Sequence, residues 1–366
     1  MAVLTEEQVM LRDMAREWTQ NESPVGAFRK MRNSAPDGGY DPTVYSTMAE
    51  LGWTGIIIPE EYGGTSFGWV SLGLVIEETA KTLTASPIAS SALAASAILQ
   101  GGDPALCGEW LPRFASGEAT GALAIDEGAR HDPAAIAATA SKTAGGWRLD
   151  GTKQFVHDAI GASVLIVAAM TDSGPALFLV SGDTAGVTLD QRQLTDMRGH
   201  AQLTLMGVTV PEAARLGDSK AFEAVLDQAR ALACAEMLGL AQQAFDTTLA
   251  YLKQRTQFGE IIARFQALQH RMADLFSRTE LMRSAVEAAL SALDSGNDIP
   301  ATVSVAKAVA NETVHLMSRE AIQLHGGIGM TDEYDIGFYM KRARVLENSY
   351  GSAAFHRDRF ATLSGY

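Results

Sequence analysis

The sequence of 366 residues predicts an α+β protein with an N-terminal α-helical domain, a middle β-barrel or β-sandwich domain and a C-terminal four-helix bundle. Ala- and Leu-rich stretches with helical spacing occupy the first third of the chain. Short β-branched runs separated by Gly, Asp and Pro lie between about Thr120 and Pro211, and apolar helical stripes return from about Lys220. The length allows several lobes with a sizeable core, and we expect domains at 1–119, 120–215 and 216–366.

Composition and charge exclude several classes of protein. A hydrophobic content of 47% with 20% charged residues is that of an ordinary globular protein. The net charge of -14, without a basic block, argues against a nucleic-acid partner. Cys107 and Cys234 lie far apart without metal-ligating neighbours, so neither a disulfide framework nor a metal site is expected. No run approaches the roughly 18 apolar residues of a membrane span, and no signal-peptide pattern opens the chain, so a cytoplasmic protein is the expectation.

The N-terminal third contains recognisable helix boundaries. Thr5 is a suitable N-cap, and the two acidic residues that follow it favour a helix start, so one helix is expected from 5 to about 32. A loop rich in Gly, Pro and Asp ends it, and a second helix is expected at about 44–51. The stretch 70–99 predicts two helices broken at Pro87.

The middle and C-terminal parts differ in the period of their apolar residues. Strands are expected at 164–169, 176–180 and 203–210, and the Asp150-Gly151 pair predicts a hairpin turn. Apolar residues at spacings of three and four predict a helix that includes 238–252. Further helices are expected at about 272–293, at about 300–324, and from about 335 to the C-terminus.

The stretch Gln254 to Phe276 is the first candidate for a binding site. Arg255 and Phe258 are three residues apart, and Gln266 follows Arg255 by eleven, close to three helical turns, so all three are expected to face one ligand. A guanidinium suits a pyrophosphate, a phenyl ring offers a flat apolar surface, and an amide both donates and accepts. The alternative is an amphipathic helix with a salt-bridged surface arginine.

A second stretch, Gln323 to Gly329 (QLHGGIG), is followed by Thr331 to Tyr334 (TDEY). Together with Leu51 to Gly64 and Asp196 to Gly199, these stretches resemble the acyl-CoA dehydrogenase family, flavoproteins that oxidise acyl-CoA thioesters to 2-enoyl-CoA. The resemblance implies FAD as cofactor, an acyl-CoA substrate and an electron-transfer flavoprotein as partner. It also implies contacts to the adenine and pyrophosphate end of a neighbouring subunit's FAD from Arg255, Gln257, Phe258, Gln266, Gln323, Gly326 and Gly327.

The same resemblance shows no carboxylate at either place where the family carries its catalytic base. One place falls on Tyr350 to Ser352, and the other on Ala229, immediately before Arg230. A tyrosine, with a reference pKa near 10, is a poor proton acceptor at neutral pH. No catalytic residue is therefore assigned to this chain.

Two carboxylates are candidates for a relocated base. Glu347 lies one turn before Tyr350, but the basic residues around it favour a structural ion pair. Glu236 interrupts an apolar helical run, where an internal or interface hydrogen-bonded pair is the favoured reading. His325 and His356 are read as core or helix-end histidines with backbone partners, in preference to general bases.

The middle domain also departs from the family pattern. Asp126 to Pro133 replaces the loop that covers the flavin, and Phe155 and His157 stand where the family has Trp and Thr at the flavin ring. The flavin-ring side thus looks eroded, while the contacts offered to a neighbour's adenine look intact. This asymmetry resembles the small subunit of bacterial heterotetrameric (α2β2) acyl-CoA dehydrogenases for steroid side chains or other bulky acyl-CoA thioesters, in which a homologous partner supplies the catalytic Glu.

Two alternatives remain open. The first is a self-sufficient homotetrameric acyl-CoA dehydrogenase with a relocated base, and the second is a structural paralogue without a redox role. Desulfination and nitroalkane oxidation occur on the same scaffold, but no residue of this sequence favours them.

Overall fold

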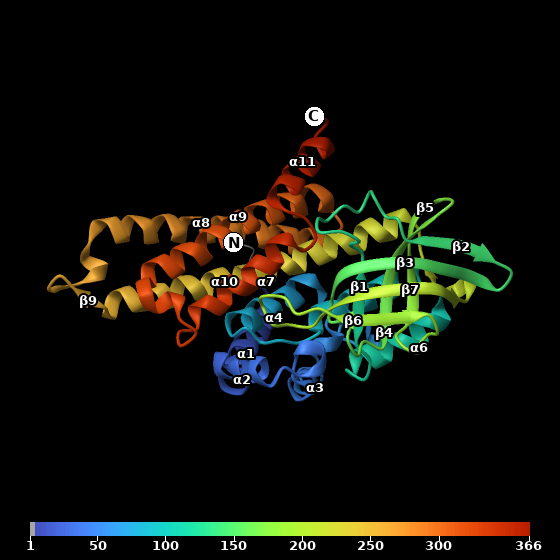
Figure 1. The fold of residues 1–366 in the computed structure, drawn as a ribbon, viewed down its shortest axis with the longest axis horizontal. Helices are drawn as coiled ribbons and strands as arrows, with labels where there is room; N and C mark the ends of the chain where they lie inside the picture. Colours follow the sequence, from blue (N-terminus) through green and yellow to red (C-terminus); the bar gives the residue numbers. More distant parts are fainter. Residues whose placement is uncertain (1–3) are drawn as a thin grey trace. The chain divides into compact units, whose positions relative to one another are not determined.

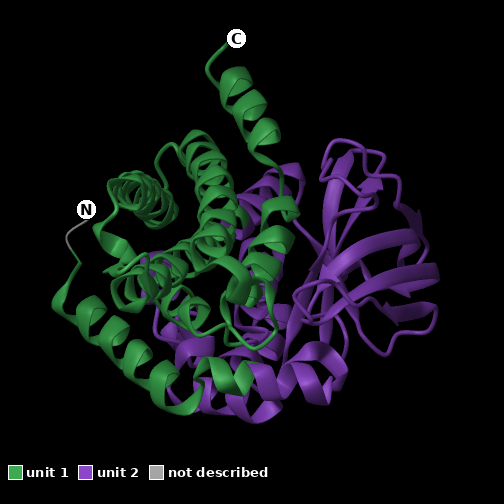
Figure 2. Cartoon of the chain, turned by 60° about the vertical axis from the view of Figure 1, so that its left-hand side comes forward, with its two compact units in different colours: residues 1–28, 73–84, 230–366 green, residues 29–72, 85–229 purple. Residues whose placement is uncertain are grey.

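The computed structural model describes residues 4–366. The chain forms two compact units, coloured separately in Figure 2. The first contains the described residues up to 28, with 73–84 and 230–366, and the second contains 29–72 and 85–229. Helices precede residue 116, strands occupy 121–216 and helices follow from 219, so the predicted order of helical, β and helical parts is confirmed (Figure 1).

The N-terminal helices begin and end close to their sequence signals. Thr5 caps α1 through a capping box with Gln8, as its side chain predicts. The single helix expected from 5 to 32 is wrong, because Ser23 and Pro24 separate two helices. The break at Pro87 is confirmed. The helices of this part are α1 (Glu6–Glu22), α2 (Val25–Ser34), α3 (Pro42–Glu50), α4 (Gly68–Lys81), α5 (Ile88–Gly101) and α6 (Pro104–Ala115).

Eight strands of the second unit form one sheet in the order β6-β7-β3-β2-β4-β5-β8, with β1 paired to β4. Residues 164–169 are completely buried, so β4 lies in the core of this layer. All three strands expected from residue 164 onward are present. The strands are β1 (Gly121–Ala124), β2 (Thr139–Thr143), β3 (Gly146–His157), β4 (Val164–Thr171), β5 (Gly174–Ser181), β6 (Val187–Gln191), β7 (His200–Val210) and β8 (Arg215–Leu216).

The hairpin expected at Asp150-Gly151 is wrong. Strand β3 continues through this pair, and its register with β7 shifts there, as at a β-bulge. The Asp150 side chain accepts a hydrogen bond from the Gly207 backbone N–H at 2.7 Å, and a Cβ on Gly151 would lie 2.5 Å from the Ala138 Cβ. The pair therefore serves sheet pairing and a close approach, whereas the β2–β3 turn lies between Thr143 and Gly146.

The C-terminal helices are α7 (Ser219–Gln254), α8 (Gln266–Ser295), α9 (Ile299–His325), α10 (Ile336–Asn348) and α11 (Ala353–Leu363). Helix α9 packs against α8, α10 and α11. Instead of the single helix expected from about 335, a turn at 349–352 separates α10 from α11. Tyr350 and Gly351 have positive φ values there, and Ser352 caps the new helix, so the chain cannot continue helically.

No helix within residues 4–366 has both the length and the apolarity needed to cross a bilayer. In the same range, no group of three or more His, Cys, Asp or Glu side chains is arranged to hold a metal ion.

Candidate functional site

The α7–α8 connection is a short β-hairpin at one end of the helical part of the first unit. Strands β9 (Thr256–Gln257) and β10 (Glu260–Ile261) pair in antiparallel fashion across a two-residue turn. Both turn residues, Phe258 and Gly259, have positive φ values, as a type I′ turn requires. The turn holds the Phe258 ring 92% exposed, although a phenyl ring gains free energy from burial.

The hairpin changes how the predicted binding residues are presented. Arg255 follows the last residue of α7, and Gln266 is the first residue of α8. The prediction that Arg255, Phe258 and Gln266 share one helical face is therefore wrong, because residues 255–265 are not an α-helix. Arg255, Gln257, Phe258 and Gln266 are all exposed, so their side chains are available to a molecule outside this chain.

An aromatic stack holds the two predicted binding stretches at the same end of the helices. The His325 ring stacks on Tyr251 of α7 with centroids 4.5 Å apart, and Tyr334 lies 4.8 Å from it. The His325 Nδ1–H donates to the Ala321 backbone oxygen at 2.7 Å, and burial lowers the pKa of the ring. His325 is thus a neutral core residue with a backbone partner, as expected. It sits directly before Gly326 and Gly327.

The second binding stretch is also exposed. Helix α9 ends at His325, and Gly326 adopts a φ of 65° before the 3-10 turn Gly326–Met330. Gln323, Gly326 and Gly327 are exposed, and a Cβ on either glycine would meet no atom of this chain within 4 Å. The close-approach space beside these glycines is thus left open toward the outside.

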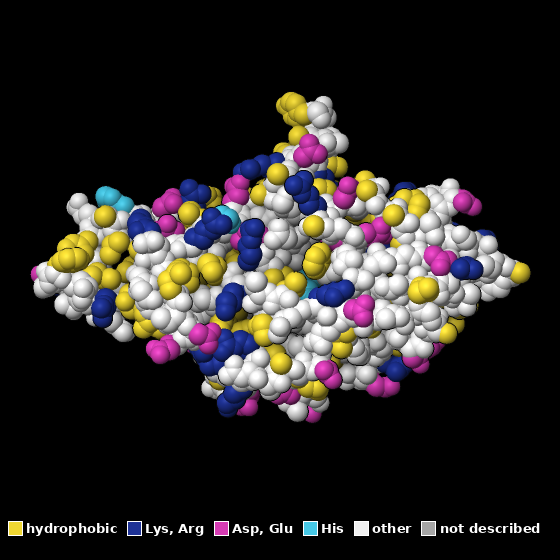
Figure 3. Space-filling model, viewed as in Figure 1, with side chains coloured by type: hydrophobic (Ala, Val, Ile, Leu, Met, Phe, Trp, Pro, Cys, Tyr) yellow, Lys and Arg dark blue, Asp and Glu magenta, His cyan; other side chains and the backbone are white. Residues whose placement is uncertain are grey.

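Exposed apolar side chains accompany these polar groups. Hydrophobic surface gathers where the α7–α8 hairpin projects (Figure 3). The exposed large hydrophobic side chains of the hairpin and of the turn after α9 are Phe258, Ile261, Phe265, Ile328 and Met330. Exposed apolar surface of this extent on a soluble protein is typical of an interface with another chain.

Both candidate carboxylate bases are engaged in ion pairs. Glu236 of α7 is 9% exposed and forms a two-pronged salt bridge with Arg342 of α10, at 2.7 and 2.8 Å. Glu347 accepts from Arg344 at 2.8 Å and lies 3.0 Å from His315 Nδ1. The structural ion pairs favoured for these two residues are present.

The turn between α10 and α11 is built by buried polar side chains of α9 and α11. Lys307 Nζ donates to the backbone oxygens of Leu346 and Gly351, and His356 Nε2 lies 2.9 Å from the Tyr350 backbone oxygen. His356 is thus a core histidine with a backbone partner, as expected. Burial, followed by the nearby Lys307 charge, lowers the pKa of His356 to about 2, so the ring is neutral.

In the second unit, the loop after β1 is held by a buried lysine. The Lys153 ammonium, completely buried, donates to the Ile125 backbone oxygen at 3.0 Å and to Glu127 at 2.6 Å. Burial opposes ionisation of Glu127, but bonds from Lys153 and from the backbone N–H groups of Ala137 and Ala138 outweigh it and lower its pKa. This loop is therefore an ordered part of the β layer.

The end of β3 carries the residues expected beside a flavin ring. Phe155 has a φ of 54° where the β3–β7 register shifts, and its side chain is 41% exposed. The His157 ring lies 4.4 Å from the His200 ring on β7. The Gln154 backbone N–H donates to the Asp126 oxygen at 2.6 Å, so the loop and this strand end adjoin each other, as the sequence comparison within one site requires.

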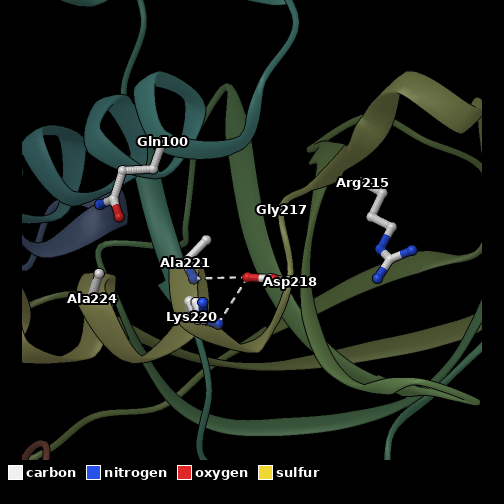
Figure 4. A pocket seen from close by; sticks show the side chains of 7 residues that line it. All are labelled: Gln100, Arg215, Gly217, Asp218, Lys220, Ala221 and Ala224. Carbon is white, nitrogen blue, oxygen red and sulfur yellow. Dashed lines mark hydrogen bonds between the residues drawn. The ribbon is translucent and has the colours of Figure 1, made fainter.

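A hollow of about 730 Å³ in the second unit lies beside the first turn of α7 (Figure 4). Arg215 and Lys220 contribute positive charges to its lining. The Asp218 carboxylate already accepts hydrogen bonds from the Lys220 and Ala221 backbone N–H groups. The start of the helix therefore has its own anion, and this hollow does not serve as an anion site.

Sequence reasoning missed the lysines that organise both regions. Lys307 and Lys153 are completely buried, and neither stands in a recognisable motif. The available signal for Lys307 was a single cation in the otherwise apolar run SVAKAVA of a predicted helix. Such a position requires internal acceptors, which only the folded chain reveals.

Two family profiles match this chain. Residues 5–118 match "Acyl-CoA dehydrogenase, N-terminal domain", and residues 219–363 match "Acyl-CoA dehydrogenase, C-terminal domain". The probable acyl-CoA dehydrogenase YngJ of Bacillus subtilis is 31% identical, over 97% of both chains.

Among solved structures, two complexes resemble this fold closely. A Tcur3481-Tcur3483 steroid ACAD variant superposes with a TM-score of 0.93 and 31% identity, over 98% of both chains. The ChsE4-ChsE5 complex from Mycobacterium tuberculosis superposes with a TM-score of 0.93 and 25% identity, over 100% of this chain and 99% of that one.

Proposed function

Because this chain belongs to the acyl-CoA dehydrogenase family, we propose that it is a subunit of an FAD-dependent enzyme that introduces an α,β double bond into an acyl-CoA thioester. Its own part is to bind the adenine and pyrophosphate end of the FAD of a homologous catalytic subunit. The observation that carries the proposal is an asymmetry. Binding groups project from the α7–α8 hairpin, while both candidate bases are held in ion pairs.

The hairpin and the turn after α9 fit one end of a dinucleotide. The Arg255 guanidinium suits the pyrophosphate, the Phe258 ring offers a face to an aromatic base, and Gln257, Gln266 and Gln323 supply amide groups. The absence of a side chain at Gly326 and Gly327 permits close approach to a phosphate. When bound, FAD accepts the hydride from the acyl chain, and these residues bind and orient it for a partner's active site.

The geometry disfavours a base supplied by this chain. To act as a base, Glu236 would have to leave Arg342, which is 6% exposed, and removing one partner of a buried pair costs roughly 3–5 kcal/mol. Tyr350 occupies the place of the family's usual base. We therefore assign the catalytic carboxylate to the partner subunit.

The heteromeric relatives support the subunit assignment and suggest a substrate class. Both complexes described above are named for pairs of proteins, and one is named for steroid chemistry. The proposal is an α2β2 assembly that acts on a steroid side chain or another bulky acyl-CoA and passes electrons to an electron-transfer flavoprotein.

Flavin absorbance tests the proposal. The chain is purified alone and after co-expression with a homologous subunit that carries a catalytic Glu. We expect bound flavin and enoyl-CoA formation only in the co-expressed complex. A flavin-loaded, active homo-oligomer of this chain would instead establish the self-sufficient enzyme with a relocated base, and a complex without flavin would establish the structural paralogue.

A further inference from the structure

Lys307 of α9 is a completely buried cation whose hydrogen bonds match its chemistry. An ammonium group has three N–H donors and no acceptor. Lys307 Nζ lies 2.9 Å from Asn311 Oδ1, 3.2 Å from the Leu346 oxygen and 3.1 Å from the Gly351 oxygen. Each donor therefore has an acceptor, and two of these acceptors are carbonyl groups at the α10–α11 turn.

Two neighbours complete this arrangement, which we call the carbonyl clamp (Lys307, Asn311 and His356). Asn311 Nδ2 donates to the Gly351 oxygen at 3.1 Å. His356 Nε2–H donates to the Tyr350 oxygen at 2.9 Å. The carbonyls of Tyr350 and Gly351 are thus held by buried donors from two helices.

The charged and titratable groups around Lys307 come from three further helices. Cys234 and Arg230 of α7 and Glu347 of α10 act on it electrostatically, and it acts on His356 of α11. Burial is the largest influence and lowers the pKa of Lys307 to about 8. Burial also raises the pKa of the Cys234 thiol to about 12, so this thiol is neutral and contributes no anion.

The clamp acts on a backbone that is conformationally strained. Tyr350 has a φ of 57°, which costs an L-residue roughly 1–2 kcal/mol, and Gly351 has a φ of 109°. A Cβ on Gly351 would lie 2.6 Å from His356 Nε2, so the turn fits closely over the clamp. Such a backbone persists only where its surroundings determine it.

We propose that Lys307, Asn311 and His356 are positioning residues that fix the α10–α11 turn so that Tyr350 forms part of the acyl-CoA site. The assignment of the turn to that site rests on the proposed function. Tyr350 is half-buried and cannot serve as the missing carboxylate. Its role is that of a wall residue that determines which acyl chains fit, and a fixed turn makes that wall rigid.

Hydrogen exchange tests the clamp in the co-expressed complex and requires no turnover. In Lys307→Met, which replaces the ammonium with an apolar group, we expect amide exchange in peptides covering 346–356 to rise about tenfold. Lys142→Met, at an exposed lysine, serves as the control and should leave these peptides unchanged. Unaltered protection of 346–356 in Lys307→Met would overturn the proposal.

Asn311→Asp is the second variant, in case Lys307→Met does not fold. The change is isosteric and keeps the acceptor for Lys307, but it places a carboxylate oxygen against the Gly351 oxygen in place of a donor. We expect faster exchange of 346–356 here too, with α8 unaffected. Wild-type exchange in this variant would likewise overturn the clamp.

A double-mutant cycle separates positioning from general stabilisation. Tyr350→Ala should change KM for a bulky acyl-CoA more than kcat, and Lys307→Met should produce the same split. In the Tyr350→Ala background, Lys307→Met should add less than about a twofold effect. Effects that multiply fully would reduce Lys307 to a structural role. A complex without turnover would refute the proposed function, and exchange at 346–356 would still decide the clamp.

Discussion

The α7–α8 hairpin and the α10–α11 turn are both short connections between helices, yet they distribute their polar groups in opposite ways. The hairpin presents Arg255 and Gln257 to the outside with an exposed Phe258. At the turn, buried donors of Lys307 and Asn311 meet carbonyl acceptors of the same chain. A segment that satisfies its own polar groups contributes to the fold, whereas one that exposes them is available to bind another molecule.

The largest expected effect of breaking the buried side of this comparison is at the Glu236–Arg342 pair. Glu236→Gln leaves the Arg342 charge without its carboxylate, and we expect the free energy of unfolding to fall by roughly 3 kcal/mol. Chemical denaturation measures this loss. Glu212→Gln, in an exposed pair with Lys142, is the control and should change stability by less than about 1 kcal/mol. Equal losses in both variants would contradict the importance of burial.

The second effect is a pH dependence from Lys307. Burial lowers its folded pKa to about 8 from an ordinary 10.5. Between these values the unfolded chain binds a proton that the folded chain does not, so the free energy of unfolding rises with pH, by roughly 3 kcal/mol in full. The penalty is present in full below pH 8. The difference between wild type and Lys307→Met, followed by denaturation across this window, should show the rise, and a flat difference would contradict it.

The part of the fold that sequence predicts is the part that local signals determine. Thr5 caps α1 and Pro87 breaks a helix because each acts on adjacent backbone. Asp150-Gly151 misled because the same dipeptide serves a tight turn or a bulge, and only pairing with β7 decides between them. The turn at 349–352 was missed because its donors come from α9 and α11, which spacing within one segment does not reveal.

The candidate site divides in the same way. The stretches with Arg255 and Gln323 were recognised from their motifs, and both prove to be exposed. Their arrangement was not predicted, because a helical spacing was assumed across residues that form a hairpin. The ion pair of Glu236 was expected from its burial, but its partner, Arg342, is 106 residues away and could not be identified from sequence.

The third prediction addresses the exposed side of the comparison. Arg255→Ala removes a charged group that we assign to the pyrophosphate, and such hydrogen bonds contribute roughly 1.5–3 kcal/mol. We expect FAD retention by the co-expressed complex to weaken about 10- to 100-fold, measured as flavin released on dilution. Arg278→Ala, at an exposed arginine of α8 paired with Asp274, is the matched control and should retain flavin. Equal retention in both variants would remove Arg255 from the site.

The smallest expected effect on stability, and the sharpest contrast with Glu236, is at Phe258. Its ring is 92% exposed in this chain, so Phe258→Ser should leave the free energy of unfolding of the isolated chain within about 0.5 kcal/mol. Relief of a left-handed phenylalanine offsets part of any lost contact with Phe265, whose ring centroid lies 6.2 Å away. The same substitution should reduce flavin content after co-expression, because the ring is then buried against the bound molecule. A variant that loses stability alone but keeps its flavin would show that the hairpin serves the fold, as the turn does.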